Sequence, residues 1–240
     1  MNMKITKHKD EYLIEKSGEQ LVKVETYRNS YHMSHCYIKF DLENLVAISD
    51  PTVFQIIADE EKSPLQVMLS SLETQKITFL ASQGFKKVRS CHEMEVKKED
   101  LLKELSSGDS KIFKASRGQN DYRECCELQF NYYKETHQAI NPLSAIFDDF
   151  TKILPAEAYY VRNNDGIQHV AFVADNLIAY VCSKDDSTFD NFALAVVNRL
   201  FEDNQSIEFE ADNVDWAAMT LKNLFLTNSP ETFDTWIYKN

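Results

Sequence analysis

Three side chains in the second half of the chain are of types that exchange protons with a substrate. His169 falls in a strand-like segment, Glu157 directly precedes one and Asp175 directly follows one. Such a side chain acts as a base when it lies within hydrogen-bond reach of the reacting group. His169 also alternates with Ile167 and Ala171 on one face of its predicted strand, which is equally typical of a packed histidine. Glu157 and His169 are therefore the candidate catalytic residues, and the sequence leaves their role open.

A short polar loop, Ser183 to Thr188, is the second feature whose residue types could take part in binding or chemistry. It reads Ser-Lys-Asp-Asp-Ser-Thr and runs into a helical pattern that begins at Phe189. Asp, Ser and Thr are the preferred helix-capping residues, so the loop suits the start of the helix that follows it.

Cysteine and histidine do not form a metal-binding pattern in this sequence. The chain has five cysteines, an odd number, and lacks a Cys-x-x-Cys motif. His32, His35 and Cys36 are close in sequence, but His35 and Cys36 adjoin a strand-like segment, Cys36 to Phe40, in which neighbouring residues point to opposite faces. We expect no metal site and no cysteine nucleophile, and we expect reduced thiols in a cytoplasmic protein.

Composition excludes several classes of protein. Only five of the 240 residues are glycine and they are widely separated, which excludes the Walker loop and the dinucleotide-binding fingerprint. The net charge of −12 excludes a basic nucleic-acid footprint. No apolar run reaches the roughly 18 residues that a membrane helix needs, and the Lys-rich start lacks the apolar core of a signal peptide.

The acidic residues are concentrated in the second half of the chain. Residues 109–240 carry 11 Lys/Arg and 21 Asp/Glu. This half therefore attracts cations, which favours an amine-bearing partner. An acidic surface that serves solubility alone is the other interpretation.

Hydrophobic periodicity predicts the elements that position these residues. In the second half the predicted strands are Lys111–Ser116, Ala158–Arg162, Ile167–Ala174, Leu177–Cys182, Ser206–Ala211 and Phe233–Tyr238. The predicted helices are Tyr122–Thr136, one opened by Asn141-Pro142 and ended by Pro155, Phe189–Phe201 and Val214–Phe225. Turn residues at Asn163–Gly166 and Asp175-Asn176 join three of the strands into an antiparallel meander.

The first half repeats the later part of this order. Its predicted strands are Glu11–Lys16, Leu21–Tyr27, Cys36–Leu42, Leu65–Leu69 and Lys86–Val96, and its predicted helices are Pro51–Glu60 and Leu72–Gln83. Lys97–Ser107 is polar and ends at Gly108, which is typical of a linker or a polar helix. We therefore predict an α+β protein of two similar units, 1–97 and 109–240, joined by a linker at 98–108. Each unit is a mixed, mostly antiparallel sheet flanked by helices.

This order of elements resembles the GNAT superfamily, the Gcn5-related N-acetyltransferases. The resemblance covers most of residues 109–240, while residues 1–97 resemble a shortened, degenerate copy that lacks the first two helices. The stretch most similar to the family is Phe79-Leu-Ala-Ser-Gln-Gly-Phe-Lys-Lys-Val88, in which Gly84-Phe85 ends a helix ahead of the last hairpin. A glycine just past a helix also suits the left-handed conformation that ends helices, so the repeated strand–helix order is the stronger signal.

The resemblance implies that the second unit binds acetyl-CoA beside the splayed strands Leu177–Cys182 and Ser206–Ala211. The pantetheine arm would pair with the free edge of the first strand as an added strand does, and the pyrophosphate would rest on the loop that opens the next helix. The cofactor-binding residues implied in this way are Tyr180, Val181, Cys182, Ser183, Lys184, Ser187, Thr188 and Phe189.

Two positions depart from the family pattern. The loop lacks the usual glycine and arginine residues and carries Asp185 and Asp186, which would face pyrophosphate with like charge. The tyrosine that serves many members as general acid corresponds to Leu80 in the first unit and falls near Lys222 in the second.

Two functions follow from the resemblance. The first is an N-acetyltransferase that moves acetyl from acetyl-CoA to an amine of a small molecule or protein. The second is a catalytically inactive GNAT-like binding module that has lost the pyrophosphate loop. The sequence leaves enzyme activity open between these two.

Overall fold

The computed structural model describes residues 3–16, 19–41, 52–102, 111–226 and 231–239. The chain divides into two compact units, and neither unit is one continuous segment. The first consists of Met1–Ser90, Ile140–Ser144 and Phe233–Asn240, and the second consists of Cys91–Ala139 and Ala145–Thr232.

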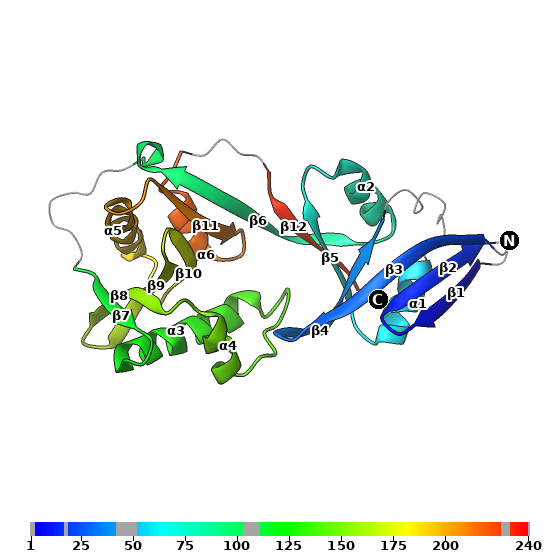
Figure 1. Cartoon of the computed structure of the whole chain (residues 1–240), viewed down its shortest axis with the longest axis horizontal. Coiled ribbons are helices and arrows are strands. Elements are labelled where there is room, and N and C mark those ends of the chain that lie inside the picture. Colours follow the sequence, from blue (N-terminus) through cyan, green and yellow to red (C-terminus); the bar gives the residue numbers. More distant parts are fainter. Residues whose placement is uncertain (1–2, 17–18, 42–51, 103–110, 227–230, 240) are drawn as a thin grey trace. The chain divides into compact units, whose positions relative to one another are not determined.

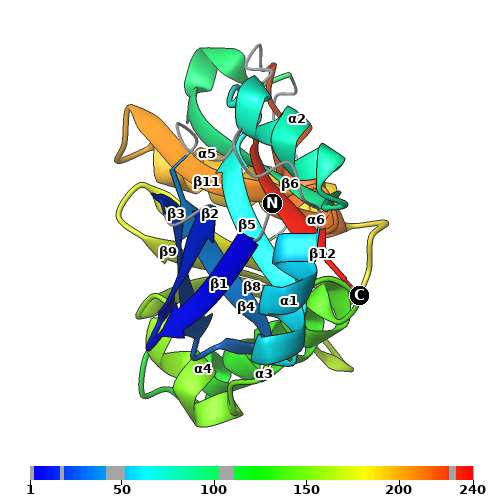
Figure 2. The same cartoon turned by 90° about the vertical axis from the view of Figure 1, so that its right-hand side faces the viewer.

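The first unit is built on a mixed sheet with two helices. Its strands are β1 (Met3–His8), β2 (Glu11–Lys16), β3 (Glu19–Asn29), β4 (His32–Phe40), β5 (Leu65–Ser70), β12 (Phe233–Tyr238) and the first part of β6 (Lys86–Lys97). They lie in the order β1-β2-β3-β4-β5-β12-β6. The pair β4/β5 is parallel, and β12 pairs antiparallel with β5. Figure 2 shows these strands together with α1 (Thr52–Glu61) and α2 (Thr74–Ser82).

Alternation along these strands sends one row of side chains into the core of the first unit. Cys36 and Ile38 of β4, Leu65 and Val67 of β5, and Trp236 of β12 are all buried in it. Phe54 of α1 is also fully buried there and meets Phe85 edge to face, with 5.0 Å between ring centroids. The opposite face of these strands carries the polar residues described below.

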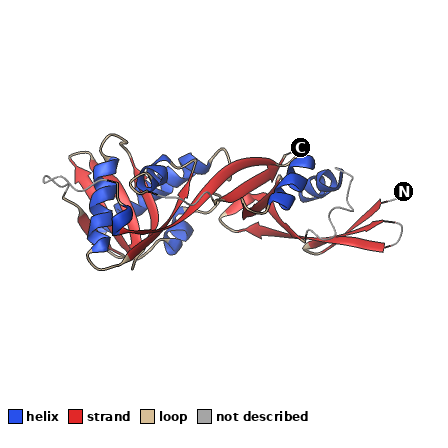
Figure 3. Ribbon diagram, turned by 90° about the horizontal axis from the view of Figure 1, so that it is seen from above, coloured by secondary structure: helices blue, strands red, loops and turns tan. Residues whose placement is uncertain are grey.

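The second unit contains the longer set of elements. Its strands are the second part of β6, then β7 (Phe113–Ser116), β8 (Glu157–Asn163), β9 (Gly166–Ala174), β10 (Leu177–Ser183) and β11 (Ser206–Asp212). Its helices are α3 (Asn120–His137), α4 (Phe147–Ile153), α5 (Phe189–Phe201) and α6 (Trp216–Lys222). The strand order is β6-β11-β10-β9-β8-β7, in which β10/β11 is the parallel pair. Figure 3 shows helices flanking the strands of this unit.

The two faces of β9 are covered by different helices. Phe172 meets Tyr122 of α3 edge to face, with 5.7 Å between ring centroids. His169 lies on the other face and packs against Phe189 and Phe192 of α5. This strict alternation fixes which strand residues point toward α3 and which toward α5.

Most predicted elements are confirmed, including the meander β8-β9-β10 and the α+β class with its mostly antiparallel sheets. Several elements differ from the prediction. Residues 3–8 form a strand, β1, that was not predicted. The predicted helix from Asn141 is wrong over its first six residues, since α4 begins at Phe147. The last helix is shorter than predicted and spans Trp216–Lys222.

The compact units differ from the predicted ranges 1–97 and 109–240. The division falls within β6, between Ser90 and Cys91, and the first unit also takes in 140–144 and the C-terminal strand. Long-range pairing causes this difference, because β12 pairs with β5, and a hydrophobic pattern does not encode the partner of a strand. The predicted linker at 98–108 lies mostly outside the described residues, apart from a single 3₁₀ turn at Lys98–Asp100 and the two residues that follow.

In the described part of the chain, no helix combines the length and the apolar character that spanning a membrane requires.

Candidate functional site

The parallel pair β10/β11 separates soon after it begins. Its register holds for only two residue pairs, Leu177↔Glu208 and Ile178↔Phe209. Between Ile178 and Tyr180 the pairing of β10 with β9 shifts by a residue, which is the signature of a β-bulge. Past the bulge the described ladder of β10 continues with β9, from Tyr180 to Ser183. The edge of β10 that faces β11 is therefore a strand edge of the kind that accepts an added extended chain.

The loop after β10 is held together by the carboxylate of Asp185. The Ser187 backbone N–H and the Ser187 hydroxyl each donate to Asp185 Oδ1, at 2.9 and 2.8 Å. The Thr188 hydroxyl lies 2.9 Å from Asp185 Oδ2. These hydrogen bonds, led by that from the Ser187 N–H, hold the pKa of Asp185 below its usual range. Donors predicted to receive a pyrophosphate thus already bind an anion that belongs to the chain.

Thr188 is the N-cap residue of α5, although its side chain makes no capping hydrogen bond. Its hydroxyl lies between Asp185 and His169 Nε2, which is 2.9 Å away. The Thr188 side chain therefore does not cap α5. Instead, Asp185 closes the loop through hydrogen bonds from other loop residues, and the Thr188 hydroxyl connects the loop to His169 in the sheet below.

His169 is buried beneath this loop. Its Nδ1 lies 2.7 Å from Ser183 Oγ, and the Ser183 hydroxyl donates its proton to the Asp185 carbonyl oxygen. Nδ1 must therefore carry a hydrogen and donate it to Ser183. Burial lowers the pKa of His169, although the charge of Asp185 opposes this shift. Each ring nitrogen of His169 thus has a hydroxyl oxygen within hydrogen-bond distance, and through Ser183 and Thr188 the ring supports the loop.

The other predicted site residues lie in different environments. Cys182 is fully buried, and burial raises the pKa of its thiol. Tyr180 faces α3 and α4, where it packs near Tyr133 and Phe150. Glu157 begins β8 at the far side of the meander and is ion-paired with Lys114 at 2.8 Å. The structure thus brings Ser183, Ser187, Thr188 and His169 together, and it leaves Glu157 two strands away from β10.

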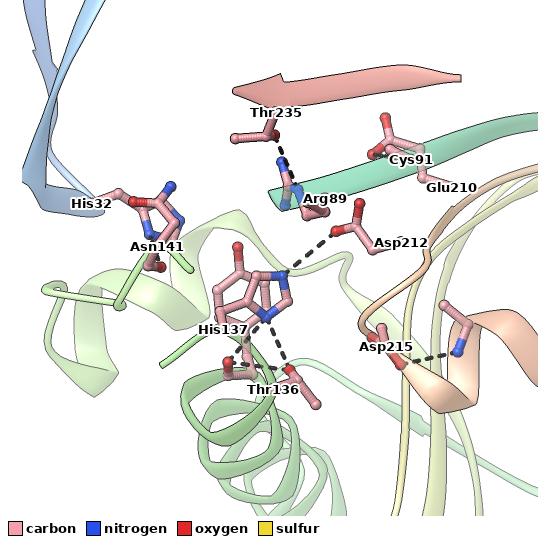
Figure 4. A network of polar contacts seen from close by, with 12 residues as sticks. His32, Arg89, Cys91, Thr136, His137, Asn141, Glu210, Asp212, Asp215 and Thr235 are labelled. Atoms are coloured by element: carbon pink, nitrogen blue, oxygen red, sulfur yellow. Dashed lines mark hydrogen bonds and ion pairs between the residues drawn. The ribbon is translucent and has the colours of Figure 1, made fainter. Parts of the chain in front are cut away.

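Polar residues that the sequence analysis missed gather where α3 and β11 end. His137 is the last residue of α3 and is buried, and its Nε2 lies 3.5 Å from Oδ2 of Asp212, the last residue of β11. Figure 4 shows His137 between Thr136 and Asp212. In the sequence, the available signal for His137 and Asp212 was that each is a polar residue at the end of a helix or strand. Hydrophobic periodicity does not reveal their contact, because the two residues are far apart in the sequence.

Asp215, which precedes α6, is the second missed carboxylate. It accepts hydrogen bonds from the Tyr132 hydroxyl at 2.6 Å and from the Ala218 backbone N–H at 3.0 Å. Burial raises its pKa, although the hydrogen bonds from Tyr132 and Ala218 oppose this shift. Asp215 therefore caps α6 and ties it to α3, which fixes the helix beside the splayed strands.

The first unit contains a second parallel pair, β4/β5, with two register pairs, Cys36↔Leu65 and Tyr37↔Gln66. Polar side chains are buried on the face away from its core. His35 Nδ1 lies 2.9 Å from Gln66 Oε1, and Asn141 Nδ2 donates to the Tyr37 hydroxyl at 2.7 Å. The same short parallel pairing thus occurs in both units.

Among the residues that the structure describes, no three His, Cys, Asp or Glu side chains form a group able to hold a metal ion.

No family model matches the sequence, and no curated protein matches it. The fold does match solved structures. One is a GCN5-related N-acetyltransferase from Sphaerobacter thermophilus, with a TM-score of 0.51 and 10% identity over 95% of this chain and 80% of that one. Another is a probable N-acyltransferase of unknown function from Enterococcus faecalis V583, with a TM-score of 0.51, 11% identity and 95% coverage of this chain. This chain spans 61% of that protein's length. The chain therefore has the GNAT fold.

Proposed function

We propose that the second unit is an N-acetyltransferase that moves an acetyl group from acetyl-CoA to a primary amine. The main support for the proposal is that β10 and β11 pair over only two residues and separate at the bulge at Ala179. A thioester that enters between two splayed strands meets backbone N–H groups of β10 that polarise its carbonyl. The amine nitrogen then attacks this carbonyl, so positioning supplies much of the rate.

The pantetheine arm suits the edge of β10 that faces β11, from Tyr180 to Ser183, where its amide groups would pair as a strand does. The pyrophosphate that follows the pantetheine arm would meet the residues that lead into α5, namely Ser183, Lys184, Ser187, Thr188 and Phe189. The net charge of −10 on residues 109–240 favours an acceptor that carries a positive charge. We also infer that the enzyme is cytoplasmic, because its five cysteines show no disulfide pattern.

A second candidate function is favoured by Asp185. Its carboxylate binds the Ser187 N–H and hydroxyl, which are donors that a pyrophosphate would need. A chain with this arrangement is also a reasonable GNAT-like module that binds a protein or metabolite without acetyl-CoA. The two candidates differ in a single measurable property, the affinity for the cofactor.

The first experiment is a calorimetric titration of acetyl-CoA into the protein at pH 7.5 and low salt. Binding at one site per chain, followed by acetylation of amines such as tyramine or spermidine, would support the enzyme. An absence of binding at millimolar acetyl-CoA would contradict it and leave the binding module.

Two variants of Asp185 make the titration sharper. In Asp185→Ala the Ser187 donors lose their internal anion, so we expect acetyl-CoA to bind about three- to tenfold more tightly, as removal of one like charge near a helix N-terminus suggests. Asp185→Asn keeps an acceptor for Ser187 without the charge and serves as the matched control. Unchanged affinity in both variants would mean that the loop does not meet the pyrophosphate.

A further inference from the structure

The carboxylate of Asp215 uses only one of its two oxygens within the protein. The Tyr132 hydroxyl and the Ala218 backbone N–H both donate to Oδ1, at 2.6 and 3.0 Å. Oδ2 has no hydrogen bond and no ion pair in the described part of the chain. Asp215 lies where the chain enters α6 (Figure 4) and is only partly buried, so a ligand can reach Oδ2. A carboxylate oxygen can only accept, so this ligand must be a donor.

Gln129 of α3 supplies a second acceptor that lacks a donor. Its side chain is 1% exposed, and Oε1 has no hydrogen-bond partner among the residues that the structure describes. A buried polar atom without a partner costs folding free energy. An unpartnered carbonyl oxygen this deeply buried therefore points to a bound donor, as the free oxygen of Asp215 does.

Both acceptors lie on the side of β10 that faces α3. Tyr132, which bonds to Asp215, follows Gln129 by three residues and lies on the same face of the helix. Helix side chains lean toward the N-terminus, so the Tyr132 ring extends over the turn that holds Gln129. Burial raises the pKa of the Cys182 thiol of β10, and Asp215 is close enough to add to this shift. Gln129 and Asp215 thus lie beside the part of β10 where the proposed thioester would bind.

Two acceptors, one of them charged, favour an ammonium group over other small donors. A water molecule can donate to both oxygens, but it does not offset the negative charge of Asp215. A calcium-like ion needs more oxygen ligands, and three metal-binding side chains do not come together anywhere in the described segments. A primary ammonium supplies both the hydrogens and the charge. Trp216, which follows Asp215 and is 37% exposed, offers an aromatic surface to its carbon chain.

We propose that Asp215 Oδ2 and Gln129 Oε1 bind the acceptor nitrogen as a primary ammonium, and that the pair selects primary alkylamines. This inference rests on the proposed N-acetyltransferase activity. The ammonium loses one proton to water, and its nitrogen forms the C–N bond to the thioester carbonyl carbon. The C–S bond then breaks, and the departing thiolate takes the second amine proton. Asp215 and Gln129 are binding residues that hold the nitrogen on the α3 side of β10.

Binding is tested without acetyl-CoA, by NMR of the ¹⁵N-labelled protein. Its two tryptophans give two indole N–H signals, which Trp216→Phe assigns, and the Trp236 signal is the internal reference. We expect butylamine at pH 7.5 to shift the Trp216 signal. N,N,N-trimethylbutylammonium has the same charge without an N–H donor, so it should bind about tenfold more weakly. Absence of a Trp216 shift with millimolar butylamine and with millimolar spermidine would overturn the proposal, as would equal binding of the trimethylated probe.

Asp215→Asn removes the charge at Oδ2 and keeps an oxygen for Tyr132 and Ala218, and asparagine caps a helix as well as aspartate does. We expect butylamine to bind about 10- to 100-fold more weakly, as loss of a hydrogen bond to a charged group suggests. Glu127→Gln is the matched control, because it removes an exposed carboxylate of α3.

Gln129→Leu should weaken butylamine binding about three- to tenfold. It should not lower the urea midpoint of unfolding, because Oε1 has no partner to lose. A purely structural role of Gln129 predicts the opposite, a lower midpoint with unchanged binding. Wild-type affinity for butylamine in either folded variant would overturn the proposal, and Gln129→Leu decides alone if Asp215→Asn does not fold.

Kinetics separate this inference from the proposed function. If an amine is acetylated, Asp215→Asn should raise the KM for the amine about tenfold or more and leave the KM for acetyl-CoA within about threefold. An unchanged KM for the amine would overturn the ammonium site and leave the acetyltransferase. Butylamine binding that depends on Asp215, in a protein that does not bind acetyl-CoA, would support the ammonium site and overturn the proposed function alone.

Discussion

At the scale of single residues, the loop after β10 is coupled to the buried ring of His169. The Thr188 hydroxyl donates to Asp185 Oδ2, and its oxygen also lies 2.9 Å from His169 Nε2. Protonated His169 carries a hydrogen on Nε2, which the Thr188 oxygen accepts. A proton on the buried ring thus adds a hydrogen bond between the sheet and the loop.

This coupling predicts how stability responds to acid. Burial lowers the pKa of His169 in the folded protein, so between the unfolded value of about 6.5 and the lower folded value the unfolded chain binds more protons. The free energy of unfolding should therefore fall as pH drops below about 6.5, with His169 contributing at most about 1.4 kcal/mol per pH unit. We expect His169→Gln to make this decline shallower.

The measurement is urea unfolding at pH 7 and pH 5.5, followed by the fluorescence of Trp216 in a Trp236→Phe background. Restricting the signal to the second unit matters, because burial also lowers the pKa of His35 in the first. His8→Gln, an exposed histidine, is the control. If the free energy of unfolding falls equally between pH 7 and pH 5.5 in the wild type and in His169→Gln, His169 does not change its protonation on unfolding.

At the scale of elements, the turn between α2 and β6 depends on one backbone angle. Gly84 has φ +89°, and a Cβ placed there would meet only the ring of Tyr238, 3.5 Å from Cε2 and 3.8 Å from Cδ2, which are ordinary contacts. Space is therefore available, and the cost of a side chain is conformational. We expect Gly84→Ala to lower the free energy of unfolding of the first unit by about 1–2 kcal/mol, the cost of the left-handed region.

Asparagine tolerates this region better than alanine does, so Gly84→Asn should cost less and is the matched comparison. Denaturant unfolding followed by Trp236, which is buried in the same core, measures both variants. A larger loss for asparagine than for alanine would mean that crowding, and not the backbone angle, requires the glycine.

Elements with strong periodicity could be predicted from the sequence almost residue by residue. The bounds of β2 and β12 are as predicted, because alternation marks a strand wherever one face is buried. The helix expected from Asn141 fails for a reason that periodicity does not contain. Asn141 is buried and bonds to Tyr37, 104 residues earlier. A contact at that distance fixes the backbone around it against the local helical preference.

The candidate site was predictable to the same extent. The strands β10 and β11 and the loop Ser183–Thr188 follow from local pattern and from the resemblance to GNAT proteins. The closure of that loop by Asp185 does not, since Asp, Ser and Thr suit a cap, a turn or an anion site equally well. His137 and Asp212 were missed because each is an ordinary polar residue at the end of an element until the fold brings them together.

At the scale of the whole molecule, the two units depend on one another unequally. The first unit is assembled from three separated segments, and the second lies between them in the sequence. If residues 91–232 unfold, the first unit must close a long flexible loop, which costs entropy. Loss of the first unit removes no comparable constraint from the second.

The chain has two tryptophans, Trp216 in the second unit and Trp236 in the first, so each unit has its own reporter. Phe54→Ala empties part of the first core, at a cost of about 3–5 kcal/mol. Phe54→Ala should lower the urea midpoint of unfolding reported by Trp236 and should not change the midpoint reported by Trp216. Phe172→Ala, its counterpart in the second unit, should lower both.

Single-tryptophan versions of each variant, made with Trp216→Phe or Trp236→Phe, separate the two signals in urea. If Phe54→Ala shifts both midpoints equally, the units unfold as one cooperative body and the dependence is mutual.

The position of β12 also sets the order in which the chain becomes foldable during synthesis. Strand β5 receives its antiparallel partner only when Phe233–Tyr238 leave the ribosome, and at 5–20 residues per second the intervening residues take roughly 10–30 s to make. All segments of the second unit emerge within that time. The unit that begins the chain is therefore completed last, and until then its β5 edge is open to pairing with other nascent chains.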